Sequence, residues 1–284
     1  MARRSVLFSP GDEPTLMRKA PDTGADTVVF DLEDAVAPDA KAAAREAVAN
    51  VLTDPSFDPD CEVCVRLNPD LRTAARDAEA ITTGAPRLDS IMVPKAESPD
   101  DVARIHELVR DGGRDCPVIA LCESAGGILG AEEISSADPV DAVAFGAEDL
   151  AADVGATRTE SGDEVAYARQ QVVLAAGAAG IDAIDTLVTD ISATDRLEAE
   201  TETARTLGYD GKIAIHPTQV EIINETFTPT NDDVDWARTV LEAAVEAEAA
   251  GRGVFRVNDE MIDAPLIARA KTIIDRYEAA RDGI

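Results

Sequence analysis

Short runs of apolar and β-branched residues alternate along this chain with longer Ala-rich segments whose apolar residues recur every three or four positions. The runs predict eight strands, at residues 5–9, 27–33, 61–68, 90–95, 118–124, 142–147, 183–188 and 212–216. The spacing between them is helical, as in the segment that opens at Ser98-Pro99-Asp100 and carries Val102, Ile105, Leu108 and Val109. Eight strand–helix repeats predict an α/β protein with a TIM (β/α)8 barrel.

A C-terminal extension follows the predicted barrel. We assign residues 1–225 to the barrel and residues 226–284 to a helical extension. The extension contains a long Ala/Glu-rich helix from Asn231 to Gly251, the stretch Met261-Ile262-Asp263-Ala264-Pro265 and a last helix. It is too short to bury a core of its own, so we expect it to pack on this barrel or on a neighbouring subunit.

The charge of the chain excludes some partners. Its 56 acidic and 26 basic residues give a formal net charge of −30, so nucleic acid and anionic membranes should be repelled. The basic residues are 21 Arg and only 5 Lys. Scarce Lys and abundant Asp are typical of a high-salt cytoplasm. We therefore predict a halophilic protein that loses ellipticity when salt falls below roughly the molar range.

The cysteines favour a reducing compartment. Cys61 and Cys64 form a C-x-x-C pair, but no second Cys or His pair follows at zinc-finger spacing, and a strand would point them to opposite faces. We interpret all four cysteines, including Cys116 and Cys122, as buried thiols. No signal-peptide pattern and no apolar run of about 18 residues is evident, so a soluble, cytoplasmic protein is expected.

Polar residues gather where the predicted strands end. The carboxyl ends of barrel strands meet at one rim, which carries the chemistry of TIM-barrel enzymes. The clustering therefore predicts a functional site at this rim. The strand ends carry Phe8-Ser9-Pro10-Gly11, Asp31-Leu32-Glu33-Asp34, Arg66-Leu67-Asn68-Pro69, Pro94-Lys95, Glu123, Asp149 and His216-Pro217.

Glu123 and Asp149 follow neighbouring predicted strands, so their carboxylates should lie side by side. Two hard oxygen ligands without a His pair or a thiolate pair favour Mg²⁺, or Mn²⁺, over zinc, and Mg²⁺ commonly takes one or two protein carboxylates. The alternative is that the two residues cap the helices that follow. Spacing alone leaves both interpretations open.

Asp31, Glu33 and Asp34 would repel one another and the predicted metal ligands. Positions 31 and 33 share one face of a strand, so we expect the cluster to bind metal-bound waters or Arg66 rather than the metal, while Asp31 or Asp34 could instead cap the next helix. Arg66 can fork onto a carboxylate or onto a developing enolate oxygen. A structural pair with Glu33 or Asp34 is the alternative.

Other polar residues have simpler explanations. Lys95 could form a Schiff base, but acidic neighbours should keep it charged, and we favour an ion pair. The stretch Ser124-Ala125-Gly126-Gly127-Ile128-Leu129-Gly130 could hold an anion at a helix start, although a tight strand-to-helix turn explains it equally well. We interpret His216 as a core or rim residue on a strand and His106 as helix surface.

Eight short motifs, in order along nearly the whole chain, resemble those of the citrate lyase beta-subunit/malyl-CoA lyase family of the HpcH/HpaI aldolase superfamily. They are Arg4-Ser5-Val6-Leu7-Phe8-Ser9-Pro10-Gly11, Asp31-Leu32-Glu33-Asp34-Ala35-Val36, Val65-Arg66-Leu67-Asn68, Pro94-Lys95, Cys122-Glu123-Ser124-Ala125, Phe145-Gly146-Ala147-Glu148-Asp149-Leu150, Ile215-His216-Pro217-Thr218-Gln219 and Met261-Ile262-Asp263-Ala264-Pro265.

This resemblance implies a TIM barrel that binds Mg²⁺ and an acyl-CoA thioester and makes or breaks a carbon–carbon bond beside a 2-oxo acid. It implies that Glu123 and Asp149 are the metal ligands, and that Arg66, with Glu123, contacts the substrate. Glu33 and Asp34 would lie behind these ligands.

The resemblance also assigns CoA contacts and a residue from the tail. CoA would contact five residues. One of them, Thr15, stands where some members of the family have a basic residue. Asp263 matches a tail aspartate that acts as acid or base in the active site of an adjacent subunit in related lyases, which implies a homo-oligomer such as a homotrimer. The implied CoA contacts are Phe8, Thr15, Lys19, Ile215 and His216.

The leading hypothesis is a lyase that acts on malyl-CoA, methylmalyl-CoA or citramalyl-CoA and releases acetyl- or propionyl-CoA with glyoxylate or pyruvate. One alternative is the beta subunit of a citrate lyase, which acts on a carrier-bound citryl thioester. Others are a hydroxy-oxo-acid aldolase that does not use CoA and a catalytically silent barrel that serves as an interaction protein.

Overall fold

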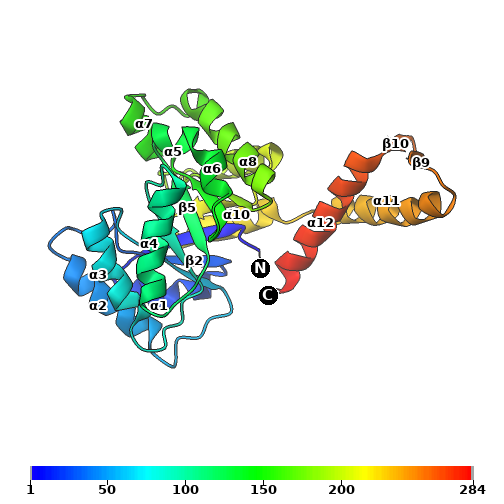
Figure 1. The fold of residues 1–284 in the computed structure, drawn as a ribbon. Coiled ribbons are helices and arrows are strands. Elements are labelled where there is room, and N and C mark those ends of the chain that lie inside the picture. Colours follow the sequence, from blue (N-terminus) through cyan, green and yellow to red (C-terminus); the bar gives the residue numbers. More distant parts are fainter. Residues whose placement is uncertain (1, 283–284) are drawn as a thin grey trace. The chain divides into compact units, whose positions relative to one another are not determined.

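The chain folds around a closed barrel of eight parallel strands. The computed structural model describes residues 2–282. Each strand pairs with the next along the chain, and β8 closes the ring on β1 (Figure 1), which confirms the predicted fold class. The strands are β1 (Ser5–Pro10), β2 (Thr27–Asp31), β3 (Glu62–Arg66), β4 (Ser90–Val93), β5 (Val118–Cys122), β6 (Val140–Phe145), β7 (Asp182–Asp185) and β8 (Gly211–Ala214).

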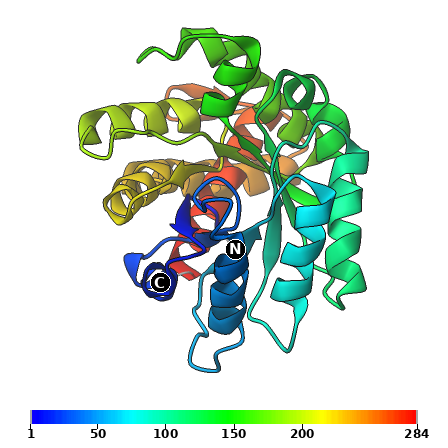
Figure 2. The same ribbon diagram turned by 90° about the vertical axis from the view of Figure 1, so that its left-hand side faces the viewer.

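Helices follow the strands and surround the barrel (Figure 2). The start signal at Ser98 works as expected, since the Ser98 hydroxyl accepts the backbone N–H of Asp101 at the start of α4. These helices are α1 (Pro14–Lys19), α2 (Lys41–Leu52), α3 (Leu71–Thr82), α4 (Pro99–Asp111), α5 (Ala125–Leu129), α6 (Ala131–Ser135), α7 (Ala147–Val154), α8 (Ala166–Ala179), α9 (Thr194–Leu207) and α10 (Pro217–Phe227), with short 3-10 turns η1 (Pro21–Thr23) and η2 (Asp163–Val165).

Several strands end earlier than the hydrophobic pattern predicted. β2 ends at Asp31 because the Asp31 carboxylate accepts the backbone N–H groups of Glu33 and Ala35, which turns the chain out of the strand. The expectation that positions 31 and 33 share a strand face is therefore wrong. So is the placement of His216 on a strand, since β8 ends at Ala214.

Apolar side chains fill the barrel interior, as the packed core of this fold requires. All the interior residues are almost fully buried, and Phe8 and Leu187 pack against them. The interior is therefore solid, and chemistry has to take place at a rim. The interior residues are Val6, Val29, Cys64, Met92, Ile119, Leu121, Ala142, Ala144, Ile184 and Ile213.

Ion pairs close the barrel at the amino ends of its strands. The guanidinium of Arg3 lies 2.7 Å from Glu62, 2.8 Å from Asp141 and 3.3 Å from Asp182, carboxylates from β3, β6 and β7. Paired and hydrogen-bonded in this way, buried charges are tolerated. This rim serves stability, which leaves the opposite rim for function.

The cysteines are free thiols. Cys64, Cys116 and Cys122 are buried and Cys61 is partly buried. Burial raises the pKa of the Cys122 thiol to about 12, so it stays protonated and behaves as an apolar core residue. Within residues 2–282, no helix is both long and apolar enough to cross a lipid bilayer.

The chain divides into two compact units, one of which is the barrel, Arg3–Glu225. The other contains α11 (Asn231–Ala249), β9 (Phe255–Val257), β10 (Glu260–Ile262) and α12 (Ala264–Asp282). A capping box between Thr230 and Asp233 opens α11. The expectation that this segment has no core of its own is wrong, because two helices and a hairpin enclose an apolar cluster: Ala237, Val240, Ala247, Phe255, Val257, Ile262 and Ala270.

Candidate active site

Arg66, the last residue of β3, is held by a fork onto Asp31. Its Nε and Nη2 donate to the two oxygens of the Asp31 carboxylate at 2.8 and 2.6 Å. Register explains the contact, because Asp31 and Arg66 are Cα partners at the ends of β2 and β3. The ring of Phe8 lies 5.0 Å from the guanidinium carbon and covers one face of it. The fork is thus used within the protein, and Nη1, the nitrogen that Asp31 does not hold, faces the carboxylates of Glu33 and Asp34.

Glu33 lies between two cations. Its Oε2 is 3.0 Å from Nη1 of Arg66 and its Oε1 is 3.5 Å from Nζ of Lys95. Both oxygens are buried, yet neither accepts a hydrogen bond from the described residues. Burial raises the pKa of Glu33 to about 7, although the positive charges of Arg66 and Lys95 oppose this rise. Asp34 is more exposed, 3.8 Å from Arg66.

Glu123 follows β5 and is almost fully buried, with 3% of its surface exposed. Its Oε1 accepts the backbone N–H of Lys95 at 2.9 Å. Gly146, at the end of β6, makes room for it, since a Cβ at that position would lie 2.5 Å from the Cβ and 2.8 Å from the Oε2 of Glu123. Burial, then the negative charges of Glu33 and Asp149, raises the pKa of Glu123 to about 8.

Asp149 lies in the first turn of α7, three residues after Gly146, rather than at a strand end. The hydroxyl of Thr186, which follows β7, accepts the backbone N–H of Ala147 at 3.1 Å and fixes the start of that helix. Because β5 and β6 are paired through Cys122 and Phe145, the segments that follow them and carry Glu123 and Asp149 are neighbours. The two predicted metal ligands therefore come from adjacent strand–helix units at one rim.

The rim has an excess of negative charge. Five carboxylates, Asp31, Glu33, Asp34, Glu123 and Asp149, act on two cationic side chains, Arg66 and Lys95. No group of three or more His, Cys, Asp or Glu among residues 2–282 forms a complete metal cage. Mg²⁺ does not need one, because water and substrate oxygens complete its shell around one or two carboxylates. The buried Glu33 oxygens, which accept no hydrogen bond from the described residues, and the raised pKa of Glu123 fit a divalent cation.

The residues expected to contact CoA come from strand β1, which contains Phe8, from helix α1 and from the loop after β8. Thr15 and Lys19 are exposed, one turn apart on α1. Ile215 and His216 follow β8, the strand beside β1. The side chain of Gln219 accepts the backbone N–H of Ile215 at 2.8 Å and holds this loop.

Asp263 belongs to the other unit and is exposed. It begins α12, where its backbone carbonyl accepts the N–H of Ile267 at 3.0 Å and its Oδ1 lies 3.4 Å from the N–H of Leu266. Its carboxylate is therefore presented to solvent at a helix start.

The glycine-rich turn has a steric explanation. A Cβ on Gly127 would lie 2.5 Å from the carbonyl oxygen of Ala96, and one on Gly130 would lie 2.7 Å from that of Glu97. The glycines let α5 pack against the loop after β4. The backbone N–H of Ala125 donates to the Asp153 carboxylate at 2.8 Å and that of Gly127 to the Ser124 hydroxyl at 3.0 Å, so these donors at the helix start are already used within the protein.

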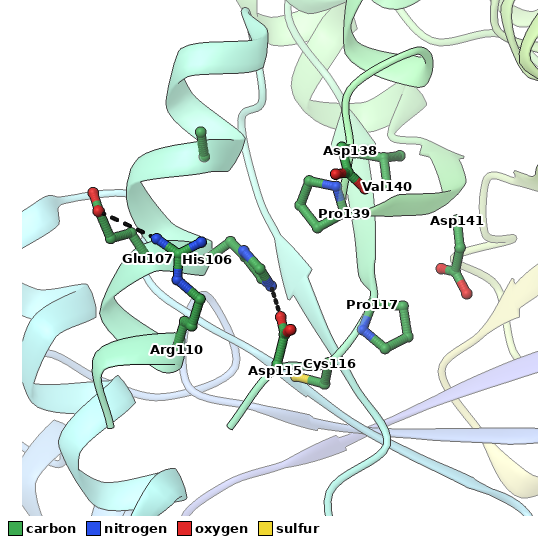
Figure 3. A pocket seen from close by; sticks show the side chains of 11 residues that line it. His106, Glu107, Arg110, Asp115, Cys116, Pro117, Asp138, Pro139, Val140 and Asp141 are labelled. Atoms are coloured by element: carbon green, nitrogen blue, oxygen red, sulfur yellow. Dashed lines mark hydrogen bonds and ion pairs between the residues drawn. The ribbon is translucent and has the colours of Figure 1, made fainter. Parts of the chain in front are cut away.

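A cavity of about 730 Å³ lies elsewhere, between α4 and the amino ends of β5 and β6. Figure 3 shows His106 facing Asp115 there, with 3.2 Å between Nε2 and Oδ1. The interpretation of His106 as helix surface is wrong, because only 9% of its surface is exposed. None of the predicted site residues lines this cavity.

Sequence reasoning named Gly146 only as part of a motif and did not name Thr186. Gly146 is required by a close approach between loops, and Thr186 acts through a single hydroxyl at a helix start. Neither contact has a local sequence signal. Asp31 was included, but its role as the partner of the Arg66 fork depends on strand register.

A closed barrel with carboxylates and a fixed guanidinium at its carboxyl rim is the framework of a metal-assisted enzyme. The family model "HpcH/HpaI aldolase/citrate lyase" matches residues 4–217, and that of a "C-C_Bond_Lyase of the TIM-Barrel fold" matches residues 163–280. The chain belongs to the HpcH/HpaI aldolase/citrate lyase family, and it is a carbon–carbon lyase.

Named relatives and solved structures are similar along nearly the full length. The chain is 38% identical over 274 residues to a citrate lyase subunit beta-like protein of Deinococcus radiodurans, covering 95% of this chain and 96% of that one. It is 35% identical to the mitochondrial citramalyl-CoA lyase of Mus musculus, covering 96% and 85%. The structure of CitE from Mycobacterium tuberculosis with magnesium, acetoacetate and coenzyme A matches with a TM-score of 0.79 and 35% identity, over 98% of both chains.

Proposed function

We propose that this protein is a Mg²⁺-dependent acyl-CoA lyase that cleaves, or forms, the carbon–carbon bond of a 3-hydroxyacyl-CoA such as malyl-CoA, methylmalyl-CoA or citramalyl-CoA. The observation that carries the proposal is the excess of carboxylates around Glu123 and Asp149, beside a guanidinium that Asp31 holds in place. The citramalyl-CoA lyase relative and the CitE complex with magnesium and coenzyme A support it.

Glu123 and Asp149 would hold the Mg²⁺. When bound, this ion supplies a Lewis acid for the hydroxyl and carboxylate oxygens of the substrate. Glu33 would accept hydrogen bonds from waters at the site, since both of its oxygens lack hydrogen-bond donors among the described residues.

Arg66 would stabilise the charge that develops on the substrate. Cleavage leaves the bonding electron pair on the thioester as an enolate, and the N–H groups of Arg66 that Asp31 does not use would donate to its oxygen. The Asp31 fork and the Phe8 ring keep the guanidinium from turning away. Asp263 from a neighbouring copy would give a proton to the enolate carbon, or remove it in condensation.

The CoA part of the thioester would lie along β1, α1 and the loop after β8. Phe8, Thr15, Lys19 and the backbone at Ile215 and His216 are the proposed CoA contacts, and Lys19 is the cation among them for a phosphate. The use of Asp263 requires at least two copies of the chain. Light scattering should therefore report a homo-oligomer, for which a trimer is our expectation.

The first experiment is a lyase assay at high salt with Mg²⁺, offering malyl-CoA, methylmalyl-CoA and citramalyl-CoA separately and trapping the released oxo acid with phenylhydrazine. Release of glyoxylate or pyruvate would name the substrate. Folded, metal-loaded protein that is silent on all three would contradict the proposal. That result would favour the carrier-dependent alternative, since citrate lyase subunit beta of Haemophilus influenzae is 37% identical over 99% of this chain.

A further inference from the structure

Lys95 has a backbone conformation that its residue type disfavours. Its φ is +50°, and among the described residues only Asn258, at +49°, shares a positive φ without being glycine. Asn tolerates the left-handed region because its short side chain bonds locally, whereas a long side chain such as Lys has no such compensation. Strain of this kind persists where the surrounding structure imposes it.

The strand ladder shows what imposes it. In the parallel pair of β4 and β5, the N–H of Ile91 donates to the carbonyl of Pro117, and such a ladder advances two residues per bond. Continued in step, it would pair the N–H of Lys95 with the carbonyl of Leu121. Instead Ala96 makes that bond, at 3.1 Å. The chain thus contains one extra residue, a bulge at Lys95.

The bulge frees one donor for the site. The N–H of Lys95, released from the ladder, donates to Oε1 of Glu123 at 2.9 Å. This donor holds one oxygen of the Glu123 carboxylate, and Gly146 lies beside the other. Without the bulge, the buried carboxylate would lose the one hydrogen-bond donor that it has among the described residues.

The ammonium group of Lys95 has a separate contact. Its Nζ lies 3.5 Å from Glu33, and 45% of the side chain is exposed. Burial works against the charged form, but the carboxylates of Glu33 and its neighbours outweigh this and raise the pKa of Lys95 above its ordinary value. The side chain therefore stays a cation, which argues against a Schiff base.

We propose that Lys95 is a positioning residue whose left-handed backbone at the bulge after β4 aims its N–H at Glu123 and thereby sets that carboxylate for a divalent cation. This rests on the proposed function, because it takes Glu123 as a metal ligand. The proposal assigns the role to the backbone conformation of Lys95. The Mn²⁺ affinity of variants at this position should therefore follow how well each residue tolerates the left-handed region, and not its charge.

The test compares K95G with K95V, which both lack the ammonium. Gly adopts the left-handed region freely and Val, which is β-branched, tolerates it least. Mn²⁺ binding, measured by the loss of the free Mn²⁺ signal in electron paramagnetic resonance, should be about tenfold weaker in K95V than in K95G. Asn258 offers a matched control: N258G and N258V should bind Mn²⁺ alike. K95A, with a smaller ratio expected, serves if K95V does not fold.

The outcomes separate this inference from the proposed function. Equal Mn²⁺ affinity in K95G and K95V would overturn the inference, even if K95V had a lower melting temperature, because the turn would then be only structural. Wild-type protein that binds no Mn²⁺ would instead refute the proposed metal site. In activity assays K95V should need more Mg²⁺ than K95G for half-maximal rate, at an unchanged KM for the acyl-CoA.

Discussion

Replacing Glu123 by Gln should stabilise the metal-free protein at pH 8 while abolishing its activity. The carboxylate is buried and faces the negative charges of Glu33 and Asp149, with the N–H of Lys95 and the more distant Arg66 as its favourable contacts. Gln has nearly the same shape and can still accept the Lys95 N–H. The substitution therefore removes the charge and keeps the packing.

The size of the effect follows from the pKa. The pKa of Glu123 rises from 4.5 in the unfolded chain to about 8 in the folded protein. The folded state therefore loses stability as the pH increases through that interval, because the unfolded chain releases the proton first. At 1.36 kcal/mol per pKa unit, the charge of Glu123 can lower the free energy of unfolding by at most about 5 kcal/mol. Water that enters the metal-free site screens part of this electrostatic cost, and we expect E123Q to be more stable by about 2–3 kcal/mol. For a chain of this length that corresponds to roughly 5 °C in melting temperature.

The assay is thermal unfolding at pH 8 and pH 5, in high salt, with EDTA or with Mg²⁺. E123Q should melt above wild type at pH 8 in EDTA, and the two should converge at pH 5, where Glu123 is protonated in the folded wild type. Mg²⁺ should raise the melting temperature of wild type and leave that of E123Q unchanged. If E123Q in EDTA at pH 8 melts at or below wild type, the electrostatic reasoning about this site fails.

Three further substitutions and one change of solvent test other parts of the site. R66K should lower kcat at least ~100-fold, because an ammonium cannot reproduce the fork onto Asp31; near-normal turnover would remove Arg66 from the mechanism. D263N should cost ~100-fold or more in rate with Mn²⁺ binding intact, and a rate close to wild type would show that the acid–base assignment is wrong. G146A should destabilise the fold by about 1–3 kcal/mol and weaken Mn²⁺ binding, since its Cβ would meet Glu123 at 2.5 Å. An unfolding free energy and a Mn²⁺ affinity that calorimetry finds unchanged would contradict the close approach. Circular dichroism should show loss of ellipticity below roughly molar salt, and a fold indifferent to salt would reject the high-salt hypothesis.

The barrel and the position of its chemical rim were readable from the sequence alone. The alternation of apolar runs with helical spacing is a local property, and in a parallel barrel it forces all strand ends to one side. Side-chain type then indicated hard oxygen ligands at Glu123 and Asp149. The ordered motifs led to the family, which the matches along the chain confirm.

Tertiary structure decided what each of these residues contacts. The fork between Arg66 and Asp31 depends on register between two strands, and the room at Gly146 depends on how closely two loops approach. The burial of His106 and the core of the C-terminal unit depend on which surfaces meet. A bulge such as that at Lys95 leaves no trace in hydrophobic spacing, because one extra residue at a strand end changes the hydrogen-bond ladder and not the pattern.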